Sequence, residues 1–151
     1  MKRVVITGAG TVNPLAQDVA GSYAAFAAGR CAIGPLTIRD VDRLSVKIGA
    51  QVHDWQSESH FDAKELTLLD RVAQFALVAA RQAVAQSGLA FAGDLGLRSG
   101  VVLGTAAGGL GTLDDSYRAV YAEGKNRVHP FVVPRLMHNA SAAHVAMAHG
   151  L

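Results

Sequence analysis

The sequence contains a single cysteine, Cys31, among its 151 residues. One cysteine excludes an internal disulfide framework and fits a reducing compartment. The formal net charge of +2 is too small to indicate nucleic-acid binding, and no apolar run approaches the roughly 20 residues that cross a bilayer. Gly8, Gly10 and Pro14 interrupt the apolar start, which argues against a secretion signal. A soluble cytoplasmic protein is expected, with neither nucleic acid nor membrane as a partner.

What the sequence does contain is apolar residues in short periodic runs. Half of the residues are hydrophobic, 17% are charged, and neither long linkers nor repeats divide the chain, so we expect one domain. Short β-branched runs alternate with helical patterns, which predicts an α/β arrangement around a largely buried sheet.

The pattern places three strands and four helices. Residues 46–52 alternate between apolar and polar or glycine positions, which predicts a strand with one buried face. Thr67 and Asp70 have capping-box spacing and predict a helix over 67–87 that ends at Gly88. Further strands are expected at 4–7 and 101–103, and further helices at 14–28, 114–121 and 139–149, the first with an apolar face made of Val19, Tyr23, Phe26 and Ala27.

Two glycine motifs raise the alternative of a nucleotide site. Gly8-Ala-Gly10 follows a predicted strand as in a dinucleotide fingerprint, but Asn13 stands at the third glycine position. Residues 104–109 have the glycine spacing of a phosphate-binding loop, but Leu110 and Gly111 replace its Lys-Ser/Thr pair. Tight turns between strand and helix explain both motifs more simply.

The histidines and the cysteine offer weak candidates for chemistry. His138, His144 and His149 are spaced six and five apart, which does not place them on one helical face, so no metal site is expected. Arg30 is the only cationic neighbour that could favour a Cys31 thiolate, and an inert loop thiol is the preferred interpretation.

Two longer segments carry the most specific information. Residues 100–110 read Gly-Val-Val-Leu-Gly-Thr-Ala-Ala-Gly-Gly-Leu, and residues 127–139 read Arg-Val-His-Pro-Phe-Val-Val-Pro-Arg-Leu-Met-His-Asn. With residues 5–15, 29–35 and 69–80, which agree in order and spacing, they resemble the amino-terminal part of a β-ketoacyl-[acyl-carrier-protein] synthase of the ketosynthase II type, in the thiolase superfamily. The resemblance spans nearly the whole chain.

The resemblance implies a thiolase-like fold, in which two similar halves stack in five alternating layers (αβαβα). Residues 1–151 would be an amino-terminal ketosynthase domain, most of the first half, truncated before the catalytic cysteine. The nucleophilic cysteine, both histidines and the active-site lysine would lie beyond Leu151, so no catalytic residue is expected here. Apolar faces of the sheet would lack their cover, and the isolated chain should expose hydrophobic surface.

The resemblance also implies an activity and its partners. Ketosynthases transfer an acyl group onto cysteine, decarboxylate a malonyl thioester and join the two by Claisen condensation, with no cofactor. The expected partners are acyl carrier protein, acyl and malonyl thioesters, and a second ketosynthase-type subunit in a homodimer or heterodimer. The leading interpretation is a 3-oxoacyl-[acyl-carrier-protein] synthase of fatty-acid or polyketide-like synthesis, inactive as residues 1–151 alone. A non-catalytic subunit of the chain-length-factor kind is the alternative, and a dinucleotide-binding domain a more distant one.

Candidate site residues follow from the same resemblance. The acyl pocket would include Ala107, Val132, Val133 and Met137, and the carrier-protein surface would include Lys64, Arg71, Lys125 and Arg127, unless these basic residues form only a solvated charged face. Two departures stand out. Thr67 and Leu68 occupy positions where many relatives are basic, and Ala106-Ala107 replaces a glycine followed by a bulkier aliphatic residue that limits the acyl pocket.

Overall fold

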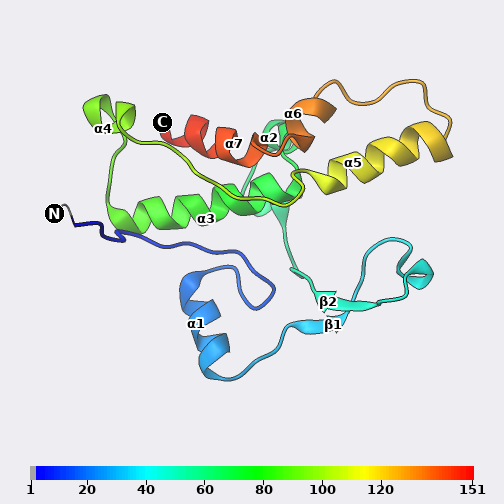
Figure 1. Cartoon of the computed structure of the whole chain (residues 1–151), viewed down its shortest axis with the longest axis horizontal. Coiled ribbons are helices and arrows are strands. Elements are labelled where there is room, and N and C mark those ends of the chain that lie inside the picture. Colours follow the sequence, from blue (N-terminus) through cyan, green and yellow to red (C-terminus); the bar gives the residue numbers. More distant parts are fainter. Residues whose placement is uncertain (1–2) are drawn as a thin grey trace.

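The structure is a computed structural model that describes residues 3–151, and helices dominate it (Figure 1). In chain order the elements are α1 (Val19–Ala27), β1 (Ile33–Pro35), the 3₁₀ turn η1 (Val41–Arg43), β2 (Ile48–Ala50), the 3₁₀ turn η2 (Ser57–Ser59), α2 (Ala63–Leu68), α3 (Arg71–Ser87), α4 (Gly93–Leu97), α5 (Leu110–Tyr117), the π-helical turn η3 (Arg118–Ala122), α6 (Val132–Leu136) and α7 (Ala140–His149). No helix among these residues is long and apolar enough to span a bilayer.

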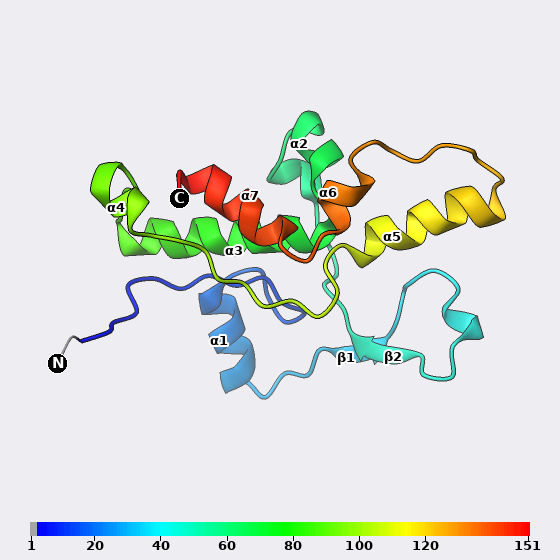
Figure 2. The same cartoon turned by 45° about the horizontal axis from the view of Figure 1, so that its top comes forward.

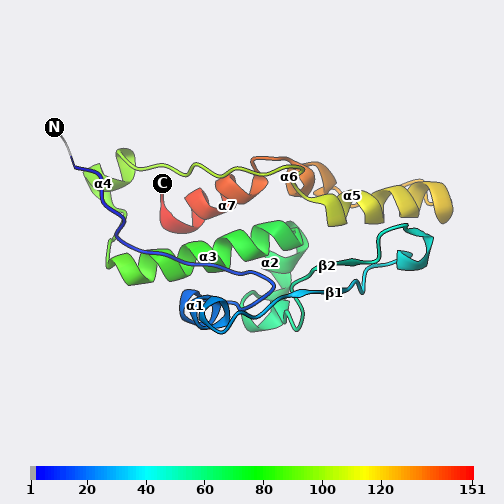
Figure 3. The same ribbon diagram turned by 60° about the horizontal axis from the view of Figure 1, so that its bottom comes forward.

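The long helix α3 lies at the centre of the molecule. In Figure 3 α7 and α5 lie on one side of it, and α1 with the two strands on the other. A small core joins α3 to α7 and to the segment before α2. Its members are 2–7% exposed: Phe61, Leu69, Ala73, Leu77, Val78 and Val145. Val12, Trp55 and Val101 pack against this core, so segments distant in sequence meet on α3.

The helix predicted at 67–87 is two helices. Leu69 is extended (φ −107°, ψ 122°) and ends α2, and the side chain of Asp70 then caps α3. The chain turns there because Leu69 enters the core, where it is 4% exposed. The capping box belongs to Asp62 and Glu65 of α2 rather than to Thr67, so that prediction was wrong, while the end at Gly88, with φ +65°, is confirmed.

Two other helices begin elsewhere than predicted, and α7 is as expected. Pro14 lies in a turn and α1 starts only after its cap, Asp18. Its predicted apolar face is not buried, since Tyr23 is 74% and Phe26 67% exposed. Helix α5 starts at Leu110, before the acidic residues that were expected to open it. The helix predicted at 139–149 is confirmed as α7.

The predicted buried sheet is absent from residues 3–151. Two strands, β1 and β2, pair antiparallel, with Gly34 opposite Gly49. Within 46–52 only Ile48–Ala50 is a strand, and its apolar residues are exposed, the reverse of the predicted face. Segments 4–7 and 101–103 have no strand partner among residues 3–151; segment 101–103 runs as extended ribbon past α3, and segment 4–7 leads up to the carboxyl end of α3 (Figure 2). A strand requires a neighbour to bond with, and no further strand of residues 3–151 lies beside them.

The molecule exposes much more surface than a compact protein of its size. Its accessible surface is 10461 Å², whereas a compact 15.7 kDa monomer has about 7,300 Å². Apolar side chains of the two unpaired segments add to this exposed surface, since Val4 is 97%, Ile6 92% and Val102 102% exposed. The expectation of exposed hydrophobic surface is confirmed.

The amino-terminal segment is held on α3 by glycines and glutamines. A Cβ at Gly8 would lie 2.0 Å from the Ala83 carbonyl oxygen, and one at Gly10 1.9 Å from the Ala79 oxygen. The side-chain oxygens of Gln86 and Gln82 accept hydrogen bonds from the backbone amides of residues 9 and 11, at 2.6 and 3.0 Å. These glycines serve close helix packing, and no helix begins directly after them to bind a pyrophosphate.

Replacing Gly10 by alanine should therefore destabilise the fold. The added methyl group must push the segment off α3 and stretch the glutamine hydrogen bonds, at a cost of about 2 kcal/mol. Urea unfolding would measure the change. Gly34→Ala is the matched control, since a Cβ there meets nothing within 4 Å. Equal stability of the two variants would contradict this packing.

Candidate functional site

The loop of residues 105–109 connects the unpaired segment 101–103 to α5 and carries Ala107. In the first turn of α5, the backbone amide and the hydroxyl of Thr112 donate to one carboxylate oxygen of Asp70, at 2.8 and 2.6 Å. Both residues are buried, with Asp70 5% and Thr112 6% exposed. We call residues 105–109 the acyl loop, after the role that the resemblance implies for Ala107. Thr112 thus ties the end of this loop to the amino end of α3.

The middle of the acyl loop packs against α6. The amide of Gly109 donates to the Leu136 carbonyl at 3.3 Å. A Cβ at Gly108 would lie 2.4 Å from that same oxygen, and one at Gly109 2.4 Å from the Arg135 oxygen. Gly108 also has φ +61°, which L side chains rarely adopt. Only glycines allow this approach, which explains the Gly-Gly pair in physical terms.

This packing places the predicted acyl-pocket residues on neighbouring elements. Ala107 and Val132 are half-buried, while Val133 is 62% and Met137 42% exposed. The loop and α6 therefore present an open apolar surface rather than a closed pocket. Whether these four side chains line an acyl chain stays a prediction.

The predicted basic residues lie in two places. Lys64 on α2 is exposed, and Arg71 at the start of α3 donates to the Val52 carbonyl at 2.7 Å, with its guanidinium 5.3 Å from the ring centre of Phe75. Lys125 and Arg127 lie beyond η3, where both are exposed. Lys125 bonds Glu123 at 2.6 Å, and this lowers the pKa of that carboxyl.

Arg135 connects the two basic places and was missed from the sequence. It lines a hollow of about 310 Å³ together with Arg71, and a second one of about 250 Å³ together with Lys125 and Arg127. Its Nε is buried and has no hydrogen-bond partner within residues 3–151. The only available signal was an arginine inside an otherwise apolar helix.

Acid–base pairs fix the loop of residues 37–45 to α5 and η3. Arg118 donates to Asp40 and, at 3.0 Å, to Asp114. The hydrogen bond and the charge of Arg118 hold the pKa of the Asp40 carboxyl below its usual value. Arg39 bonds Asp115 at 3.1 Å. All these groups are exposed enough for solvent to screen them.

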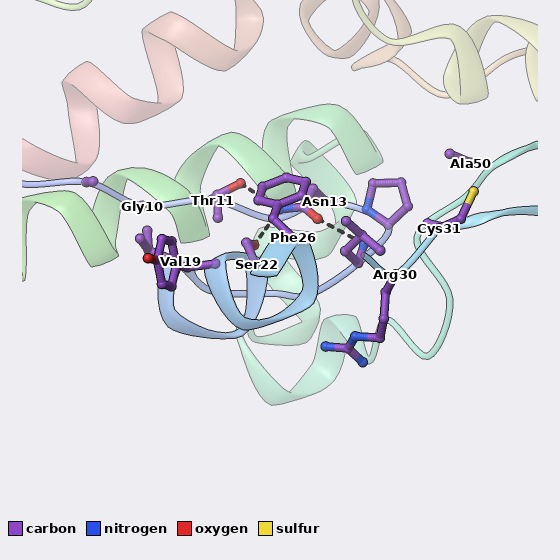
Figure 4. A pocket seen from close by; sticks show the side chains of 14 residues that line it. Gly10, Thr11, Asn13, Val19, Ser22, Phe26, Arg30, Cys31 and Ala50 are labelled. Carbon is purple, nitrogen blue, oxygen red and sulfur yellow. Dashed lines mark hydrogen bonds between the residues drawn. The ribbon is translucent and has the colours of Figure 1, made fainter. Parts of the chain in front are cut away.

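A larger hollow lies on the other side of α3, beside α1. It has a volume of about 750 Å³ and apolar walls that include Phe26 and Cys31 (Figure 4). Asn13 supports its rim: its amide donates to Ser22 at 2.7 Å and its oxygen accepts from the Leu15 amide at 2.9 Å. Cys31 is exposed and its sulfur accepts from the Ile33 amide at 3.4 Å, with no histidine among the residues that line this hollow.

The three histidines near the carboxyl end do not gather. His138 is exposed, and His144 packs beside Leu68, where burial lowers the pKa of its imidazole. The Nε2 of His149 is buried, and none of the described residues 3–151 forms a hydrogen bond with it. Among residues 3–151 no three histidine, cysteine or acidic side chains come close enough to hold a metal ion.

Comparison with known proteins identifies the family of the chain. Residues 1–151 match the family model described as "Beta-ketoacyl synthase, N-terminal domain". The chain is 34% identical over 146 residues to 3-oxoacyl-[acyl-carrier-protein] synthase 2 of Staphylococcus aureus strain N315, which covers 97% of the chain and 35% of that protein. The chain spans about a third of the length of the curated relatives it matches.

Solved structures agree on the fold. A β-ketoacyl synthase from Burkholderia phymatum STM815 superposes with a TM-score of 0.75 at 27% identity, over 97% of this chain and 36% of that one. A second match is a chain in the solved complex of a type II polyketide acyl-carrier protein with its ketosynthase bound to the hexaketide. It superposes with a TM-score of 0.74 at 21% identity, over 99% of this chain and 40% of that one. The chain therefore has the thiolase-like fold of the amino-terminal half, although segments 4–7 and 101–103 have no strand partner among residues 3–151.

Proposed function

Since the chain belongs to the β-ketoacyl synthase family and matches its amino-terminal domain, we propose that it acts as the first part of a 3-oxoacyl-[acyl-carrier-protein] synthase. The activity would be decarboxylative condensation of acyl and malonyl thioesters in fatty-acid or polyketide-like synthesis. The observation that carries the proposal is the continuous family match over residues 1–151, which includes the acyl loop and α6.

The parts of this chain would position substrates rather than react with them. The acyl loop and α6 offer small and aliphatic side chains, which bind an acyl chain by the hydrophobic effect. The nucleophile, two histidines and a lysine would come from further residues of the protein, because Cys31 has no base beside it. An oxyanion hole of backbone amides would stabilise the tetrahedral intermediate there.

The exposed apolar segments support assembly with further ketosynthase structure. The side chains of Val4, Ile6 and Val102 are almost fully exposed, and their backbone groups bond no other backbone group among residues 3–151. A neighbouring strand would supply the missing partners. We propose that remaining residues of the protein and a second ketosynthase-type subunit cover this surface, in a homodimer or heterodimer in the cytoplasm.

The experiment that tests the activity uses the full-length protein with acyl and malonyl thioesters. A catalytic synthase, tested without any other ketosynthase, releases carbon dioxide and forms the 3-oxoacyl product. A subunit of the chain-length-factor kind does so only when mixed with an active ketosynthase. Absence of product under both conditions would contradict the proposed function.

Carrier protein should dock on the basic row formed by Arg71, Arg135, Lys125 and Arg127. Acyl carrier proteins have acidic surfaces, so exposed arginine and lysine raise the association rate through long-range attraction. Lys64 would extend the row along α2. The charge of Lys125 is partly offset by Glu123, which leaves Arg127 as the stronger contributor.

Replacing Lys125 and Arg127 with glutamate in the full-length protein should slow carrier-protein association about tenfold at low salt and flatten its salt dependence. Stopped-flow association rates across ionic strengths would measure both. Arg98→Glu is the matched control, since Arg98 lies on the exposed turn after α4 and pairs only with Asp94 among residues 3–151. Equal association rates for the double variant and wild type would show that Lys125 and Arg127 form only a solvated charged face.

A further inference from the structure

We propose that Asp70 is a positioning residue for acyl-chain selection, which fixes the acyl loop and with it Ala107 through Thr112. The inference rests on the proposed function, because it requires that Ala107 face the acyl chain. It goes beyond that function by assigning a role to a residue distant from the loop in sequence.

The two carboxylate oxygens of Asp70 have separate tasks. One accepts from the Val72 amide at 3.2 Å and caps α3, while the other accepts both hydrogen bonds of Thr112. Thr112 lies in the first turn of α5, where backbone amides have no partner inside the helix, and the cap residue Gly109 offers no side chain. Asp70 therefore caps two helices, and its negative charge lies at both amino ends, where it is favourable.

Burial distinguishes Asp70 from the other capping aspartates. Asp18 and Asp62 cap α1 and α2 from exposed positions, whereas Asp70 is 5% exposed. Among residues 3–151 no basic side chain forms an ion pair with it, so its hydrogen bonds and the two helix ends stabilise the carboxylate. An exposed aspartate would cap α3 equally well. A buried one adds a fixed attachment for the acyl loop.

The attachment at Thr112 works together with the contact on α6. The Gly109 amide bonds the Leu136 carbonyl, and the loop lies so close to α6 that a Cβ at Gly108 or Gly109 would be 2.4 Å from a carbonyl oxygen of Leu136 or Arg135. Held at both places, Ala107 keeps one position relative to α6. Loss of the Thr112 attachment would leave the loop held on one side only, and a long acyl chain would lose contacts that a short chain never makes.

The test uses Asp70→Asn in the full-length protein. Asparagine can still cap α3 through its oxygen, but its amide nitrogen then faces the Thr112 amide and hydroxyl, where it cannot accept. Transacylation of a long acyl thioester should fall about fivefold, the effect of one hydrogen bond of ordinary net strength, and that of a short one less than about twofold. Thr112→Val should reproduce this and Thr112→Ser should resemble wild type. Asp62→Asn, which weakens a cap on α2, is the matched control and should leave the long-to-short ratio unchanged.

Amide hydrogen exchange of the peptide covering residues 104–113 provides a reading independent of activity. Exchange should accelerate in Asp70→Asn and Thr112→Val but not in Asp62→Asn. Unchanged exchange, or an equal loss for long and short chains, would overturn the positioning role. If wild type performs no transacylation either alone or with an active ketosynthase, the proposed function fails by itself, and the exchange result still decides whether Asp70 fixes the loop.

Discussion

A purified polypeptide of residues 1–151 is expected to show no condensation of acyl and malonyl thioesters above background. Condensation needs a cysteine nucleophile and groups that assist proton transfer and decarboxylation. Cys31 is exposed, lies beside apolar walls and has no histidine in its hollow. Loss of proton-transfer assistance alone costs on the order of 10²–10⁴-fold in rate, before the missing nucleophile is counted.

The comparison should use the full-length protein at equal concentration, and both samples must be free of host synthase. Release of carbon dioxide and formation of the 3-oxoacyl product report the reaction. Measurable product from residues 1–151 would mean that the chain contains catalytic groups that its described geometry does not bring together.

Replacing Ala107 with isoleucine in the full-length protein should shorten the acyl chains that it accepts. The larger side chain would fill the volume of two or three methylenes of a long acyl chain, and burial of each methylene is worth roughly 0.8 kcal/mol. Long-chain transacylation should therefore fall on the order of thirtyfold, because about 2 kcal/mol is lost from transition-state binding. Short chains should be nearly unaffected.

The matched control is Ala106→Ile, because Ala106 is the exposed neighbour of half-buried Ala107 in the same loop. Rates with one short and one long acyl thioester distinguish the variants. Equal losses for both lengths at Ala107 would show that this position does not select chain length. Val132, Val133 and Met137 would then be the next positions to replace.

Helices and helix ends could be predicted where a few neighbouring residues determine them. The end of α3 at Gly88 and the whole of α7 follow from local patterns, because a left-handed glycine and an alanine-rich run act within a few residues. The break at Leu69 could not be predicted, since an unbroken helical pattern runs through it. Only the core, which draws Leu69 inward, separates α2 from α3.

Two of the three predicted strands, at 4–7 and 101–103, are not strands of the structure, and the reason is different. Segments 4–7 and 101–103 have the β-branched composition of buried strands, yet composition cannot supply a hydrogen-bonding partner. The candidate site likewise has a part that the sequence suggested and a part that it did not. The resemblance placed the acyl loop, α6 and the basic residues, whereas Arg135 and the Asp70–Thr112 attachment depend on contacts between residues 42 apart and more, which no local pattern encodes.

The most direct test of the account is to locate the acyl group on the natural protein. The protein is incubated with an acyl thioester, digested, and analysed by peptide mass spectrometry. The account predicts one acyl group on a cysteine outside residues 1–151, with Cys31 unmodified. Stoichiometric acylation of Cys31 would contradict it.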